Sequence, residues 1–207
     1  MRKLRHGELE ECFADPVSWV ARKLATKGRP RVGYDRVTKM AIYKYHAAGS
    51  LALARQHLAR LLNSYHLSSP IRAAQCEDRL EEYSAWFSAE QPMVVKCKHN
   101  ILLDISSGWF LSGEVGRIDY LGEEYDYRGV LLESSDDVWM EDLRMPLLQR
   151  ALADAFHRRD EEFCVALQGL DGMMLDVRSF SYAEIEDAMV KARSLAEALS
   201  QAWMPES

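Results

Sequence analysis

Hydrophobic residues in the first ninety positions recur at the three- and four-residue spacing of amphipathic helices. The clearest stripe runs from Leu51 to Leu62. Asp15-Pro16 and Ser69-Pro70 each place a capping side chain directly before a proline, which favours the start of a helix. The pattern therefore predicts helices over 16–25, 34–46, 51–62 and 70–88.

After Pro92 the pattern changes to short apolar runs separated by turns, which is typical of β-strands. Helical periodicity returns over 138–158, and again after Ser181, where Glu184 completes a capping box before a helix that runs to about Trp203. The strands are expected over 93–95, 101–103, 109–120, 125–133, 162–168 and 173–179, with a polar turn at 98–100 and a hairpin turn at 171–172.

This order of elements predicts an α/β (α+β) fold, in which helices flank a central mixed β-sheet. We expect a helical N-terminal region over 1–91 and an α/β core over 92–207, packed as one compact unit. The hydrophobic fraction of 48% and the charged fraction of 28% place the chain among ordinary globular proteins. No apolar stretch reaches the length of a membrane span, and the charged N-terminus does not resemble a secretory signal. A cytoplasmic location is expected.

Charge is distributed unevenly along the chain. Residues 1–60 carry 13 Lys and Arg against 5 Asp and Glu, whereas residues 61–207 carry 13 against 27. A basic segment on an acidic body is a sign of nucleic-acid contact, although the two parts could equally attract each other within the fold. The basic residues expected to contact phosphates are Lys23, Lys27, Arg29, Arg31 and Arg36.

The candidate chemistry lies in two acidic residues on consecutive predicted strands. Residues 113–119 read G-E-V-G-R-I-D, and Glu133 follows Asp119 by fourteen positions in the run V-L-L-E-S-S. Two carboxylates on neighbouring strands can hold Mg²⁺ or Mn²⁺ through oxygen ligands. Alternatively, Asp119 pairs with Arg117 or Arg128 and has no metal role. The four cysteines are scattered and form no zinc or iron–sulfur motif.

These motifs and the order of the elements resemble the RecB-like branch of the PD-(D/E)XK nuclease superfamily over roughly residues 93–200. The resemblance implies a restriction-endonuclease-like core, with Asp119 and Glu133 as metal ligands and His46 completing the site. It also implies that Gln149 is the first residue of a Q-x-x-x-Y-like motif, whose fourth following position is Ala153 rather than an aromatic residue.

Measured against that family, the site lacks its lysine. The lysine position, two residues after Glu133, is Ser135, and no lysine occurs from His99 to Val190. Losing one such electrostatic contact commonly raises a barrier by about 3–4 kcal/mol. In an alternative register, Leu131 takes the place of the second acid and Glu133 that of the lysine. Arg150 on the following helix is a candidate for a migrated cation.

Three functions follow from this pattern. The first is a catalytically inactive or impaired nuclease-fold subunit that binds nucleic acid or a partner protein in a DNA repair, recombination or anti-phage defence complex. The second is an active Mg²⁺- or Mn²⁺-dependent DNA nuclease with a substituted or migrated catalytic cation. The third is an interaction protein with no nucleic-acid role.

Overall fold

The computed structural model describes residues 2–25, 32–106, 108–122, 125–133 and 143–203. Its helices are α1 (Leu9–Ala14), α2 (Pro16–Ala25), α3 (Tyr34–Ala48), α4 (Leu51–Ser64), α5 (Pro70–Glu90), α6 (Arg144–Phe156) and α7 (Tyr182–Ala202). Its strands are β1 (Arg2–Arg5), β2 (Met93–Ser106), β3 (Trp109–Tyr120), β4 (Tyr127–Glu133), β5 (Phe163–Gly169) and β6 (Met174–Arg178). The expected α/β fold with a central mixed sheet is confirmed.

Strand β3 organises the sheet. It pairs along one edge with the antiparallel strand β2, while the other edge is shared by β1, parallel at residues 109–112, and β4, antiparallel at residues 117–120. The sheet then continues through β5, parallel to β4, to the antiparallel strand β6. On the shared edge, residues 113–116 have neither β1 nor β4 opposite them. This leaves a short opening in the sheet between two strands that both end there.

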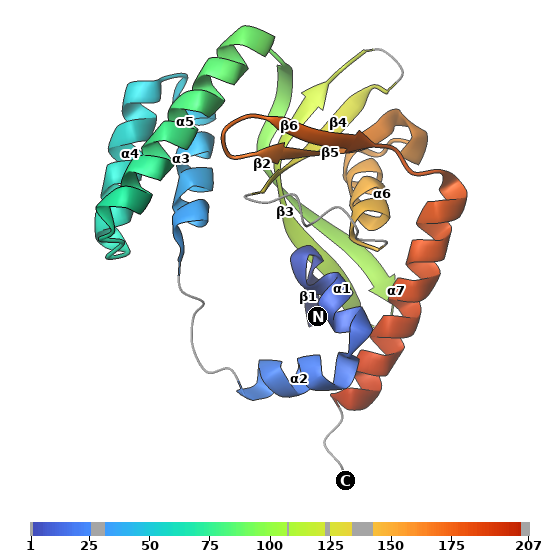
Figure 1. Ribbon diagram of the computed structural model, residues 1–207. Coiled ribbons are helices and arrows are strands. Elements are labelled where there is room, and N and C mark those ends of the chain that lie inside the picture. Colours follow the sequence, from blue (N-terminus) through green and yellow to red (C-terminus); the bar gives the residue numbers. More distant parts are fainter. Residues whose placement is uncertain (1, 26–31, 107, 123–124, 134–142, 204–207) are drawn as a thin grey trace.

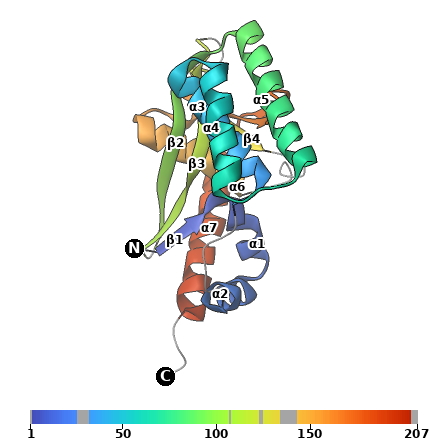
Figure 2. The same ribbon diagram turned by 90° about the vertical axis from the view of Figure 1, so that its left-hand side faces the viewer.

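Helices cover the two faces of the sheet as separate layers. One face packs against α1, α2, α6 and α7 around a core that includes Trp109, Leu148 and Phe163. The other face packs against α3, α4 and α5 around Leu58 and Leu80. Figure 1 shows the α3–α5 lobe and the α6–α7 pair on opposite sides of the sheet, and Figure 2 shows α3, α4 and α5 standing together beside the upper part of β2 and β3.

The start of α6 is capped by a residue that is distant in sequence. Leu143, the N-cap residue, makes no side-chain capping bond. Instead, Oε1 of Glu10 on α1 accepts hydrogen bonds from the backbone N–H groups of Leu143 at 2.7 Å and Arg144 at 3.0 Å. A carboxylate at this position satisfies free N–H groups and complements the positive end of the helix dipole. The N-terminal segment therefore fixes where α6 begins.

Local signals predicted most element boundaries. Asp15 accepts from Ser18 N–H at the start of α2, and Ser181 with Glu184 forms the expected capping box of α7. The expected break at 98–100 is wrong, because β2 is one strand over Met93–Ser106. Lys98 carries the irregularity instead, with φ of 52° inside the strand. Strand β1 and helix α1 were not expected.

The expected regions 1–91 and 92–207 share both cores. Leu4, Leu9 and Trp19 pack with the first cluster, and Val130 and Ala166 pack with the helices of the second. Among the described residues, no helix combines the length and apolar character that crossing a bilayer requires.

Candidate functional site

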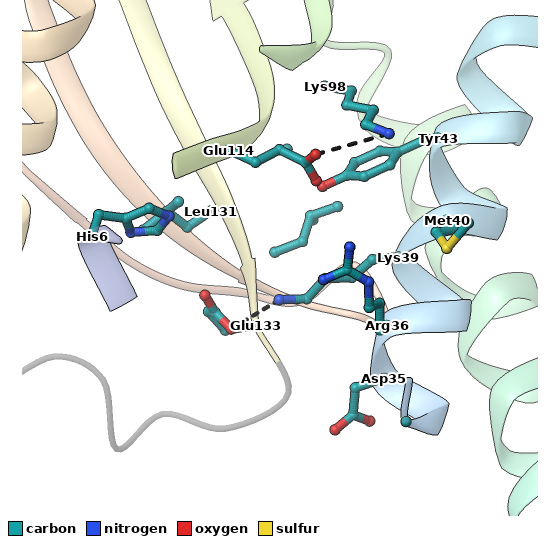
Figure 3. Close-up of a pocket in the computed structure, with 13 residues that line it drawn as sticks. His6, Asp35, Arg36, Lys39, Met40, Tyr43, Lys98, Glu114, Leu131 and Glu133 are labelled. Carbon is teal, nitrogen blue, oxygen red and sulfur yellow. Dashed lines mark hydrogen bonds and ion pairs between the residues drawn. The ribbon is translucent and has the colours of Figure 1, made fainter. Parts of the chain in front are cut away.

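A cavity of about 510 Å³ lies at the opening in the sheet, between α3, the middle of β3 and the end of β4. A second cavity of about 750 Å³ continues it toward β1 and shares four of its lining residues. We call the two together the strand-end groove. Its charged side chains, part of which Figure 3 shows, are Lys3, Arg5, Glu8, Asp35, Arg36, Lys39, Lys98, Glu114, Glu133 and Arg144.

Glu133 ends β4 at this groove and has both carboxylate oxygens occupied. Oε2 accepts from Nζ of Lys39 at 2.9 Å, and Oε1 accepts from a terminal guanidinium nitrogen of Arg144 at 2.9 Å. Burial on its own raises the pKa of Glu133, but the two neighbouring cations outweigh burial and hold the pKa below its usual value. The carboxylate is thus ionised and neutralised by two side chains of the protein.

Arg144 also fixes His6 at the end of β1. Its Nε donates to Nδ1 of His6 at 2.8 Å, while the imidazole donates to the backbone carbonyl of Glu114. Burial, and then the charge of Arg144, lowers the pKa of His6 to about 4, so the ring is neutral near pH 7. Gly113 provides the space for it, since a Cβ there would lie 1.7 Å from Cδ2 of His6.

The far wall of the groove is formed by α3. Tyr43 donates to the carboxylate of Glu114, and burial followed by this carboxylate raises the Tyr43 pKa. Lys98 reaches in from β2, with Nζ 3.9 Å from Glu114 and 5.8 Å from the centroid of the Tyr43 ring. Carboxylates and cations therefore alternate along the groove.

Asp119 lies elsewhere, in a buried polar network on the α3–α5 face. The guanidinium of Arg117 donates to both of its oxygens, at 2.6 and 3.0 Å, and Arg128 adds a third bond at 3.1 Å. Arg117 also donates to Tyr83 Oη at 2.5 Å and to Gln168 at 3.0 Å. The side chains of Arg117 and Asp119 are fully buried. The ion-pair alternative for Asp119, which the sequence also allowed, is the one observed.

His46 joins this network without reaching the groove. Its Nε2 lies 2.8 Å from Tyr83 Oη, and burial, followed by the charge of Arg117, lowers the pKa of His46 to about 4. Tyr83 therefore stands between His46 and the Arg117–Asp119 pair.

The three expected metal ligands, Asp119, Glu133 and His46, do not converge. Successive side chains of β4 point to opposite faces of the sheet, since Leu131 packs in the first core and Leu132 in the second. Glu133 therefore projects from the face of Leu131, which is opposite to the α3–α5 face on which Asp119 lies. The described residues contain no group of three or more His, Cys, Asp or Glu side chains that could hold a metal ion. The expected juxtaposition of these three ligands is therefore wrong for the described residues, in which lysine and arginine side chains pair with the carboxylates of Asp119 and Glu133.

The remaining expected catalytic residues also lie apart from the groove. Gln149 is buried and donates to the carbonyls of Asp160 and Phe180, so it ties α6 to two loops. Arg150, the candidate migrated cation, pairs with Asp160 and Glu186. Ser135 lies outside the described residues.

Of the expected phosphate-contacting residues, Arg36 lines the groove and is exposed. Lys23 instead pairs with Glu8 at 2.6 Å, and Lys27, Arg29 and Arg31 lie outside the described residues. Five groove cations were not expected from the sequence, because they come from four different elements: Lys3, Arg5, Lys39, Lys98 and Arg144. The basic excess of residues 1–60 was a signal for the first three.

Comparisons with known proteins agree with the fold. The sequence matches no family model and no curated protein. Its structure is similar to that of a protein from Eubacterium rectale named "putative exonuclease", with a TM-score of 0.59, 8% sequence identity, and coverage of 97% of this chain and 81% of that chain. Another solved structure, SSO0001, gives a TM-score of 0.36 at 10% identity over 94% of this chain and 86% of that one, which is too low to carry an argument.

The fold defines a mixed α/β protein whose architecture is similar to that of this "putative exonuclease". At 8% identity the similarity concerns the fold alone. Membership of the RecB-like branch stays a prediction.

Proposed function

We propose that this chain is a nuclease-fold protein that binds nucleic acid in its strand-end groove and does not cleave it by divalent-metal chemistry. The observation that carries the proposal is the neutralisation of the acidic pair by protein cations. Glu133 is held by Lys39 and Arg144, and Asp119 by Arg117 and Arg128. A metal ion would have to displace cations that are covalently part of the chain, one of which, Arg117 at Asp119, is fully buried.

The charge of the groove supports nucleic acid as the ligand. Among the described residues, six cationic and four carboxylate side chains line it, although the chain as a whole has a net charge of −6. A local positive excess on an acidic protein directs a polyanion to one place. Arg36 is an exposed groove cation and forms no ion pair with any described residue. It is thus available to a phosphate.

The experiment combines binding and cleavage on one preparation. Fluorescence anisotropy with labelled single- and double-stranded oligonucleotides is followed over 50–300 mM salt, and the same oligonucleotides are incubated with Mn²⁺. We expect salt-dependent binding and intact oligonucleotide. Arg36→Ala should weaken binding by about fivefold at 0.1 M salt, roughly one lost phosphate contact. Arg193→Ala on α7, which removes the same charge far from the groove, serves as the control.

A second candidate, an active nuclease with a migrated cation, is favoured by one observation. Lys39 on α3 lies 2.9 Å from Glu133 in a pocket that also contains Glu114. This arrangement places a lysine beside two carboxylates, although not at the strand position that the family uses. Mn²⁺-dependent cleavage that disappears in both Glu133→Ala and Lys39→Ala would establish this function and remove the first one.

A further inference from the structure

A second groove continues the strand-end groove along α3, between this helix and the first half of β2. It consists of cavities of about 500 and 630 Å³ that share His46, Val94 and Cys97. The first of them also shares Met40, Tyr43 and Lys98 with the cavity at the sheet opening. We call it the lysine groove. The two grooves therefore form one track that follows the length of α3.

The lysine groove differs from the strand-end groove in its charge. Lys44, Lys96 and Lys98 line it, and no Asp or Glu is found among the described residues around it. Lys44 and Lys96 form no ion pair with any described residue. Burial lowers the pKa of His57 and His46, which also line it, so neither ring adds a charge near pH 7. Uncompensated positive charge in a concave site attracts an anion.

Lys98 stands at the junction of the two grooves in an unusual backbone conformation. Its φ of 52° lies in the left-handed region, inside a strand whose flanking residues Cys97 and His99 remain paired with β3. This conformation is strained for a non-glycine residue, and such strain is concentrated at functional sites. The Lys98 side chain lies beside Tyr43, with Nζ 5.8 Å from the centroid of its ring, as Figure 3 shows. The strain places a cation where the two grooves meet.

The lysine groove also offers apolar surface beside its charges. Val94, Val95 and Met40 line one cavity, and Phe87 with Tyr45 lines the other. Val95 is 48% exposed. In a duplex the bases are stacked and hidden, whereas a single strand presents base faces to apolar and aromatic side chains while its phosphates meet cations. The combination fits a single strand better than a duplex.

We propose that the lysine groove is an extension site for a single strand of nucleic acid, whose phosphates contact Lys44, Lys96 and Lys98 after it leaves the strand-end groove. This inference rests on the proposed function, because it assumes that the strand-end groove binds nucleic acid. To the proposed function it adds the route that the strand follows along α3 and the phosphate contacts along this route, which do not depend on the 5′–3′ direction of the strand. It also adds a preference for unpaired strands.

The test compares Lys44→Ala/Lys96→Ala with Lys191→Ala/Arg193→Ala, which removes the same charge from α7. The probes are a labelled 20-nucleotide single strand, a labelled 6-nucleotide single strand and a 20-base-pair duplex. Each lost contact to a single strand lowers the salt slope by about 0.7, or affinity about fivefold at 0.1 M salt. We therefore expect the groove variant to bind the 20-nucleotide strand about 25-fold more weakly, with a slope lower by about 1.4, and the α7 variant to match the wild type.

Lys98 is tested separately, because its backbone conformation distinguishes a binding role from a structural one. Lys98→Gly removes both the strain and the charge, so it should unfold at a temperature no lower than the wild type while binding about fivefold more weakly. Lys98→Arg keeps the charge and should retain affinity. Equal binding by Lys98→Gly and the wild type would overturn the role of Lys98 at the junction.

The outcomes separate this inference from the proposed function. If the wild type binds the strand, and Arg36→Ala weakens binding while the Lys44/Lys96 variant does not, the extension site is refuted and the strand-end groove stands. If duplex binds more tightly than single strand, the preference for unpaired strands is refuted. If no oligonucleotide binds at 50 mM salt, the proposed function fails and the extension site fails with it.

Discussion

Lys39 and Glu133 are in contact at 2.9 Å although they are 94 positions apart in the sequence. The contact joins the α3–α5 lobe to the end of β4, and its carboxylate also holds Arg144. Glu133 therefore occupies Lys39, a cation that could otherwise meet a phosphate, and shares Arg144 with His6. In a metal nuclease the same residue would be indispensable, so its replacement discriminates between the two functions.

Glu133→Gln should increase the affinity for nucleic acid. The amide no longer neutralises Lys39, and one released cation corresponds to about fivefold tighter binding at 0.1 M salt and a salt slope steeper by about 0.7 for a single strand. Arg144 remains engaged with His6 and is expected to contribute less. Anisotropy titrations over a salt series measure both quantities, with thermal unfolding to verify the fold. Weaker binding by the variant would count against a blocking role for Glu133.

Asp119→Asn should destabilise the fold without touching the groove. The substitution leaves Arg117 buried with a neutral partner, and breaking a buried ion pair costs about 3–5 kcal/mol. Chemical denaturation of the variant gives this free energy directly. Asp104→Asn, a change at an exposed carboxylate on β2, is the matched control and should shift stability by less than about 0.5 kcal/mol. Wild-type stability in Asp119→Asn would mean that Arg117 is held by Tyr83 and Gln168 alone.

The elements of the fold were predictable where the signal was local. A capping box, a proline at a helix start and the Asp171-Gly172 turn each act within four residues, and the corresponding elements lie where these signals put them. Strand β1 has no such signal. Its four residues are charged at three positions, and only pairing with β3 makes them a strand.

The candidate site was less predictable, because it is made of distant residues. The spacing of Asp119 and Glu133 correctly indicated neighbouring strands, but it could not show the face on which each side chain lies. In the structure Arg117 and Asp119 lie on the α5 side of the sheet, where Arg117 donates to Tyr83. Similarly, the polar run at 98–100 located a real backbone irregularity at Lys98. Continued pairing with β3 on both sides kept it within one strand.

Stability should fall between pH 6.5 and pH 4.5 because of His6 and His46. Both have a pKa of about 4 in the folded protein, against 6.5 for an unperturbed histidine. The unfolded chain binds protons more readily in this window, so the contribution of the neutral rings is complete above pH 6.5 and is lost as the pH falls toward 4. Each ring contributes on the order of 3 kcal/mol.

Urea unfolding at pH 7, 5.5 and 4.5 measures this loss. His46→Gln, which can still accept a hydrogen bond from Tyr83, should reduce the pH dependence relative to the wild type. An unchanged dependence would show that His46 is protonated as easily in the folded state as in the unfolded one.

Gly113→Ala should displace His6 and lower stability. The added Cβ would overlap the imidazole ring, and overpacking of this kind costs about 1–3 kcal/mol. Gly7→Ala is the control, because no atom lies within 4 Å of a Cβ at that position. Thermal unfolding of the two variants should differ by several degrees. Equal melting temperatures would indicate that the N-terminal segment can move aside without loss of contacts.

The pairing of β1 with β3 has a consequence for how the protein is made. Arg2 aligns with Trp109, so the first strand of the chain finds its neighbour only after 107 further residues have been synthesised. At about 5–20 residues per second, the ribosome needs roughly 5–20 seconds to supply them. Throughout that interval Leu4 and the backbone edge of this segment lack the partner that β3 will supply, so a chaperone or a neighbouring polypeptide can bind them first.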